Sequence, residues 1–265
     1  MGMNQTNRVN QSQLERQQLL ADIRSEIERR LTTMMVSTHI LAYEVVRSQG
    51  RIRDFDSVAQ GILEKIDGIT NLQQAPKGVV MNIYPLKGHL EALGHNILGD
   101  KRRNAQAFAA VESGELTLAG PLTLVQGGVA VIARMPVYVF DGGVKNVSNR
   151  GDDTEEAPFW GFVSALIMLE DVLQSPSLAS LANKGFSHKF SRFDASKNKT
   201  VDFAQRGKLS EAFSDKIDIT FPNGKWTLAI GTDSAVGIGP SRFELALTLL
   251  FSFLLAASSP WLLKK

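Results

Sequence analysis

The chain has no cysteine among its 265 residues. This excludes disulfide frameworks, thiolate zinc sites and thiol nucleophiles together, and it agrees with an oxidising compartment such as the bacterial periplasm. The chain also lacks an excess of charge of either sign, because 29 basic and 27 acidic side chains leave a net charge of only +2. Without a concentrated basic run, the electrostatic pattern of a nucleic-acid-binding protein is missing, and we expect no nucleic acid partner.

The short motifs of common enzyme sites are absent as well. The sequence contains no GxSxG elbow, no P-loop and no GxGxxG fingerprint. His89, Glu91 and His95 lie close together, but their spacing differs from that of the HExxH zinc helix, and His39 and His188 are isolated. We therefore expect no catalytic residue, no metal ligand and no cofactor in this chain.

The two ends of the chain differ sharply. Residues 1–12 are polar and lack the apolar core of a signal peptide. Residues 245–263 carry no charge, and a helix of this length can cross about 30 Å of hydrocarbon. Trp261 would be the interfacial anchor of such a helix, and Lys264 and Lys265 would flank it on the cytoplasmic side. We expect a transmembrane helix at 245–263, an upstream helix preceding Met1, and an output region following Lys265.

A long helix is predicted from Leu14 to Gln49, where apolar residues recur at spacings of three and four between Leu20 and Val45. Such a helix suits a stalk that dimerises through this apolar seam. The same spacing also fits a helix packed on its own domain, and this alternative stays open.

The rest of the chain predicts a mixed, α+β fold. A second amphipathic helix is expected over Asp56–Asp67, with Asp54 or Asp56 as its N-cap, and a third between Asp100 and Gly114. Residues 141–157 read as a surface loop, and Asn223-Gly224 is a hairpin signal. The expected strands are Val79–Ile83, Leu116–Ala119, Leu122–Gln126, Val129–Phe140, Phe159–Ala165, Phe186–Phe193, Thr200–Phe203, Lys216–Phe221 and Trp226–Gly231.

Seven short motifs in this order resemble one family, the CHASE sensory domain, which is the extracytoplasmic ligand-binding module of bacterial receptors and plant cytokinin receptors. They are Val79-Val-Met-Asn-Ile-Tyr-Pro-Leu86, Glu91-Ala-Leu-Gly-His95, Leu118-Ala-Gly-Pro-Leu122, Gln126-Gly-Gly128, Ala133-Arg-Met-Pro-Val-Tyr138, Phe159-Trp-Gly-Phe162 and Pro222-Asn-Gly-Lys-Trp-Thr-Leu228.

The resemblance implies a stalk with a second helix over 1–75, a membrane-distal PAS-like domain over 76–175 that binds a small ligand, and a membrane-proximal PAS-like domain over 176–240. The helix at 245–263 would follow. In this layout the sensor region lies in the periplasm of a bacterium and is anchored in the inner membrane. The outputs attached to such sensors are histidine kinases, diguanylate cyclases or cyclic-di-GMP phosphodiesterases, and none of these lies within this chain.

The chain departs from the cytokinin receptors at two pocket positions. Their acidic residue, which pairs with the adenine ring, falls at Arg103, with Arg102 one position away, and their small pocket hydroxyl residue falls at Ala119. An arginine at the mouth of a pocket favours a carboxylate or a phosphate. The expected ligand is thus a small anion, not a cytokinin.

Further candidates for the ligand pocket come from the strands. Arg134 either points into the pocket or pairs on the outer face of the sheet. Tyr84 and Tyr138 each join an apolar ring to a hydroxyl group, which suits either a binding cavity or a core. Leu118, Val125 and Phe162 either wall the pocket or pack the interior.

The sequence is compatible with three functions. In the first, a ligand sensor transmits binding through the stalk and membrane helices, and its partners are a small molecule, the lipid bilayer and a second copy of the chain. In the second, the domains are packed solid and serve as a structural, dimerisation or protein-interaction module. In the third, an extracytoplasmic hydrolase needs a serine and a histidine within hydrogen-bond reach, for instance at Ser164. We favour the sensor.

Overall fold

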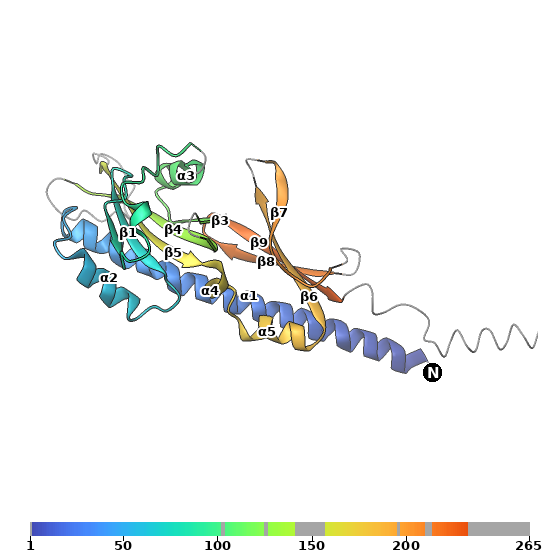
Figure 1. Ribbon diagram of the computed structural model, residues 1–265. Coiled ribbons are helices and arrows are strands. Elements are labelled where there is room, and N and C mark those ends of the chain that lie inside the picture. Colours follow the sequence, from blue (N-terminus) through green and yellow to red (C-terminus); the bar gives the residue numbers. More distant parts are fainter. Residues whose placement is uncertain are drawn as a thin grey trace, which may run out of the picture.

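The computed structural model describes residues 2–101, 104–124, 127–140, 157–194, 197–209 and 214–232, with residues 2–10 and 12 described by backbone alone. One long helix, α1 (Gly2–Arg47), runs beneath two antiparallel sheets that lie end to end along it (Figure 1). The long helix and the mixture of helices with antiparallel sheets confirm the expected α+β class.

The first sheet has the strand order β2-β1-β5-β4-β3, and the second has the order β7-β6-β9-β8. The strands of the first are β1 (Asn71–Pro76), β2 (Asn82–Tyr84), β3 (Thr117–Thr123), β4 (Val129–Tyr138) and β5 (Phe159–Met168). Those of the second are β6 (Phe186–Asp194), β7 (Lys199–Arg206), β8 (Asp215–Phe221) and β9 (Gly224–Thr232). The short helices are α2 (Phe55–Leu63), η1 (Leu90–Ala92), α3 (Ala105–Ser113), α4 (Leu169–Val172) and α5 (Pro176–Asn183).

The apolar seam of α1 is buried within its own molecule. The helix packs on β4 and β5 of the first sheet and on β8 of the second. A homodimer through this seam is therefore not available, because the sheets already cover its side chains, and the alternative of a helix packed on its own domain holds. The seam residues, each at most 3% exposed, are Leu20, Ile23, Ile27, Leu31, Met34, Thr38, Leu41 and Val45.

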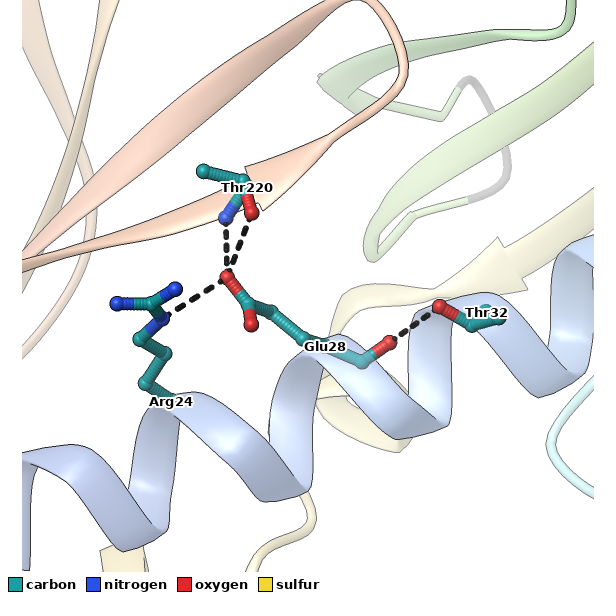
Figure 2. Close-up of polar contacts among 4 residues, drawn as sticks. All are labelled: Arg24, Glu28, Thr32 and Thr220. Carbon is teal, nitrogen blue, oxygen red and sulfur yellow. Dashed lines mark hydrogen bonds and ion pairs between the residues drawn. The ribbon is translucent and has the colours of Figure 1, made fainter.

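Polar contacts fix α1 against the second sheet. Glu28 accepts hydrogen bonds from the Thr220 backbone N–H and hydroxyl, each at 2.7 Å, and from Arg24 Nε at 3.2 Å (Figure 2). Nearer the N-terminus, Arg16 Nε lies 2.6 Å from Asp215 Oδ2. The beginning and the end of β8 are thus both attached to the helix.

A second acidic residue of α1, Glu26, holds the start of α5. Its carboxylate accepts from the hydroxyls of Ser175 and Ser177 and from the Ser177 backbone N–H. Ser175 in turn caps α5 by accepting from Leu178 N–H. The sequence did not predict α5, which is only eight residues long.

The predicted strands Leu116–Ala119 and Leu122–Gln126 form one strand, β3, with a register shift between Ala119 and Leu122. Gly120 makes this possible, because it adopts a φ of +106° where a Cβ atom would lie 2.9 Å from the Ala130 carbonyl oxygen. Val125 and Gln126 lie outside the described residues.

Other boundaries differ from those expected. The helix predicted over Asp56–Asp67 ends at Leu63, although Asp54 is its N-cap as expected. Of Val79–Ile83, only Asn82 and Ile83 belong to a strand, and Val79 makes an isolated bridge to Asn96. Most of the loop expected at 141–157 lies outside the described residues.

Among the described residues, no helix combines the length and the apolar character that a membrane crossing requires. The transmembrane helix expected at 245–263 lies outside them.

Candidate functional site

A row of polar side chains crosses the five-stranded sheet on one face. Thr117 in β3 lies opposite Arg134 in β4, which lies opposite Ser164 in β5, which lies opposite Gln73 in β1. Residues directly opposite one another in an antiparallel sheet share a face, so these four side chains line up across four strands. We call them the polar row.

Most of this row is buried, and three of its four residues have a polar atom without a hydrogen-bond partner among the described residues. Thr117, Arg134 and Ser164 are 3%, 7% and 1% exposed. Arg134 Nε, Thr117 Oγ1 and Ser164 Oγ have no hydrogen-bond partner among the described residues, and neither does Nδ2 of Asn71, two residues along β1 from Gln73. Buried polar groups are nearly always paired, so a cluster of unpaired ones on one face requires an explanation.

Arg134 carries a charge that no described acidic side chain neutralises. Burial lowers the pKa of its guanidinium to about 10, and no acidic side chain in the described part of the chain acts against this shift. The group therefore stays positive at neutral pH. The guanidinium lies over the ring of Phe162, whose centroid is 5.6 Å from the guanidinium carbon. A cation over an aromatic face is stabilised by much less than a buried charge costs, so the described residues compensate the charge of Arg134 only in part.

Helix α3 and a group of aromatic rings stand beside the row on the same face. Phe162 packs edge-on against Phe159, which packs edge-on against Tyr138. The Tyr138 hydroxyl donates to the Val111 carbonyl oxygen at 2.6 Å and so fastens α3 to the sheet. Helix α3 thus covers the face opposite to α1, as Figure 1 shows.

The structure brings several predicted site residues to this face. Phe162 contacts Arg134, and Ala119 lies two residues from Thr117 and is 4% exposed. Tyr138 joins the same face through Phe159, although its hydroxyl is used by α3.

Two predicted residues lie on the opposite face of the sheet. Leu118, opposite Ala133, is part of the core between the sheet and α1, and Tyr84, opposite Leu72, packs against that core. Strand alternation turns both away from Arg134, so neither can line a pocket with it. Arg102, Arg103 and Val125 lie outside the described residues.

Sequence reasoning missed most of the polar row. Thr117 and Gln73 of the row, and the nearby Asn71, were not singled out, and Ser164 was considered only as a nucleophile. The sequence does show a lone polar residue within an apolar strand at Thr117 and at Ser164. It does not show that both lie opposite Arg134, because this depends on the register of the strands.

Ser164 does not form the pair that a serine hydrolase needs. All four histidines of the chain are described, and Ser164 Oγ has no hydrogen-bond partner among the described residues. No described group therefore stands ready to take its proton.

Two surface grooves lie away from the row. One, of about 400 Å³, runs between α1 and α2 and is lined by Ile40, Val58 and Ile62 among others. The other, of about 550 Å³, lies beside β1 and includes Gly50, Gln74 and Met81. Neither contains a buried, unpaired polar group of the kind found in the polar row, so the chemistry favours the row over the grooves.

Comparison with known proteins agrees with this architecture. A family model described as the CHASE domain matches residues 11–201. The comparison with curated proteins gives no match. A solved structure described as an extracellular ligand binding receptor, from Desulfohalobium retbaense DSM5692, resembles the chain with a TM-score of 0.59 and 16% sequence identity. The likeness covers 81% of this chain and 39% of that one, and at this identity it shows a shared fold.

Proposed function

Because the chain belongs to the CHASE domain family, we propose that it is an extracytoplasmic sensor domain that binds a small anion at the polar row of its five-stranded sheet. The observation that carries this proposal is Arg134, a buried cation with an unpaired Nε and no described acidic neighbour. A carboxylate or phosphate group would supply the missing negative charge and accept hydrogen bonds from the guanidinium.

The neighbouring hydroxyls fit the same ligand class. Thr117 Oγ1 and Ser164 Oγ flank Arg134 on either side, and neither has a hydrogen-bond partner in the part of the chain that the structure describes. Each can donate one hydrogen bond to an anionic oxygen. The aromatic group of Phe159 and Phe162 offers an apolar wall for the remainder of a small organic acid.

The layout implied by the family completes the proposal. The five-stranded sheet would belong to a membrane-distal PAS-like domain within 76–175, and the four-stranded sheet to a membrane-proximal one within 176–240. Residues 245–263 would cross the inner membrane and lead to a diguanylate cyclase, a phosphodiesterase or a histidine kinase. The sensor region would then lie in the periplasm.

Dimerisation is part of the same proposal, but through a different surface from the buried seam. On the outward face of α1, Val36, Ile40 and Tyr43 are 43%, 39% and 62% exposed, at helical spacings of four and three. A second copy of the chain would pack on this stripe. Sedimentation of the Tyr43→Glu variant tests it, because a wild-type dimer would become a monomer and a wild-type monomer would contradict it.

Ligand binding can be tested by thermal unfolding of the full chain in detergent. We would titrate acetate, succinate and inorganic phosphate into the wild type, into Arg134→Met, and into Arg192→Met as a matched control in a strand of the other sheet. A ligand at 100 times its Kd stabilises a folded protein by about 2.7 kcal/mol. The proposal expects a saturable rise in Tm with at least one anion, kept in Arg192→Met and lost in Arg134→Met.

Two results would overturn this function. One is the absence of any saturable shift with all three anions. The other is a shift of equal size in Arg134→Met, because the anion would then bind elsewhere. In either case the structural or interaction module becomes the better description of the chain.

A further inference from the structure

The turn between β8 and β9 reaches from the second sheet to the first. Asn223 Oδ1 accepts a hydrogen bond from the Leu118 backbone N–H at 2.7 Å, and Asn223 Nδ2 donates to the Leu118 carbonyl oxygen at 3.3 Å. One side-chain amide thus holds both backbone groups of one residue in the other sheet. We call this pair of hydrogen bonds the Asn223 clasp.

The clasp fits the edge of the first sheet. β3 is the last strand in that sheet, so one side of it has no neighbouring strand. In an antiparallel pair, alternate residues turn their N–H and C=O groups away from the partner strand. Leu118 is such a residue. The Asn223 side-chain amide has an oxygen that accepts and an NH₂ group that donates, so it pairs with the Leu118 N–H and C=O groups as a residue of a neighbouring strand would.

The clasp is adjacent to the proposed ligand site. Leu118 lies between Thr117 and Ala119, whose side chains are on the face that carries Arg134. A rotation of the β3 backbone that reorients Thr117 must also move the Leu118 N–H and C=O groups, since they belong to adjoining peptide units.

The same hairpin is also attached to the long helix, close to its turn. Thr220, three residues before Asn223, donates both its backbone N–H and its hydroxyl hydrogen to Glu28 of α1, as Figure 2 shows. Asp218 and Lys225 hold the two strands of the hairpin together, with Nζ of Lys225 2.5 Å from Asp218 Oδ2. A continuous chain of contacts therefore runs from the edge of the polar row, through a braced hairpin, to α1.

We propose that Asn223 is a positioning residue that couples occupancy of the polar row to the second sheet and to α1, by holding the backbone of the strand that carries Thr117. This inference rests on the proposed function of the row, but the clasp can be tested without a ligand. A ligand that binds Thr117 stabilises the hydrogen bonds of the clasp. Because coupling between two sites is reciprocal, an intact clasp in turn raises the affinity of the row for the ligand.

The first experiment measures amide hydrogen exchange of the full chain. In Asn223→Ala we expect exchange in Thr117–Thr123 and in Asp215–Thr232 to rise about tenfold, because the Leu118 N–H loses its acceptor and the hairpin loses its anchor. Asn223→Asp keeps an acceptor and loses the donor, so its effect should be smaller. Lys216→Ala is the control, because Lys216 is an exposed residue of β8 that takes no part in the contacts described above. Unchanged exchange at Leu118 in Asn223→Ala, or an equal change there in Lys216→Ala, would overturn the proposal.

The second experiment is a double-mutant cycle with Arg134→Met, which alters the residue opposite Thr117. We expect Arg134→Met to change exchange in Asp215–Phe221 by at least about threefold when Asn223 is present, and to leave it unchanged when residue 223 is alanine. Equal effects in both backgrounds would show that the two sites are not coupled through the clasp.

Inorganic phosphate separates this inference from the proposed function. If phosphate stabilises the wild type, the factor by which it slows hairpin exchange should equal the factor by which Asn223→Ala weakens its binding. If phosphate and the other anions fail to bind, the proposed function fails, while the double-mutant cycle still decides whether Asn223 couples the two sheets.

Discussion

At the residue scale, Arg134 is unusual among the described side chains because it is both charged and buried. It lies in β4, between β5 and β3, is 7% exposed, and has Nε unpaired among the described residues. An arginine kept for packing alone would be expected to find a carboxylate or carbonyl partner, because a buried, unpaired charge costs several kcal/mol. The partner that we propose for it is an anion from outside the chain.

This explanation predicts that Arg134 destabilises the ligand-free protein. Replacing it by methionine, which has a similar unbranched shape, should leave the free energy of unfolding unchanged or raise it by about 1–4 kcal/mol. Urea unfolding of extensively dialysed wild type and Arg134→Met measures the difference. A loss of more than about 1 kcal/mol would mean that the arginine supports the fold itself.

At the scale of elements, α1 carries both an apolar seam and a set of polar attachments. The spacing of three and four between apolar residues was visible in the sequence, and the helix it predicts is present. The partner of the seam was not visible, because a helix on a sheet and a helix in a coiled coil use the same periodicity. Helix α2 and the hairpin at Asn223 were foreseen, since capping and turn residues act locally.

The seam gives a direct prediction about α1. Ile27 is fully buried against the sheets, so Ile27→Ala should lower the free energy of unfolding by about 2–4 kcal/mol. Leu14→Ala, at an exposed position of the same helix, should change it by about 0.5 kcal/mol or less. Urea denaturation measures both. A change in sedimentation mass in Ile27→Ala, with unaltered stability, would instead favour the dimer seam.

The acidic residues of α1 make its attachment dependent on pH. Burial by itself raises the pKa of Glu28, but hydrogen bonds from Thr220 and Arg24 outweigh this and hold the pKa below its ordinary value of 4.5. A lowered pKa in the folded state means that the carboxylate stabilises the protein above pH 4.5, and that this contribution is lost as the pH falls below it.

Glu28→Gln should therefore lower the free energy of unfolding at neutral pH by about 1 kcal/mol or less, since Glu28 and Thr220 are partly exposed. At acid pH the free energies of unfolding of the variant and the wild type should lie closer together. Urea unfolding at a series of pH values measures this. Glu112→Gln, an exposed position on α3, is the control. A difference between wild type and Glu28→Gln that grows as the pH falls would contradict the sign of the effect.

At the scale of the whole molecule, the two sheets share one helix. β8 is attached to α1 at Asp215 and Thr220, and the first sheet packs on the same helix through β4 and β5. We expect the sheets to unfold together. In a variant with Trp160 and Trp261 replaced by phenylalanine, the fluorescence of buried Trp226 reports the second sheet, and far-UV circular dichroism reports the helices. Their urea midpoints should coincide, and an earlier loss of Trp226 fluorescence would show that the second sheet is independent.

The arrangement of strands was the part of the fold least accessible from the sequence. β1 was missed because Asn71–Pro76 is largely polar and does not alternate between apolar and polar residues. Its buried positions are Asn71, Leu72, Gln74 and Ala75, and two of these four are polar. The candidate site was only partly foreseen for the same reason. Arg134, Phe162 and Ala119 are recognisable one by one, but their alignment with Thr117 and Ser164 depends on pairing between strands that are far apart in the chain.

The central claim is that Arg134 meets an anion that this chain does not provide. NMR observation of the Arg134 side-chain Nε–H group, assigned by its loss in Arg134→Lys, tests this at the atom concerned. Titration with succinate or inorganic phosphate should shift the Arg134 signal saturably, with the downfield proton shift of a new charge-assisted hydrogen bond, while arginines on the surface respond little. An Arg134 signal that stays in place while Tm rises would contradict the claim, and so would one that stays in place with every anion tried.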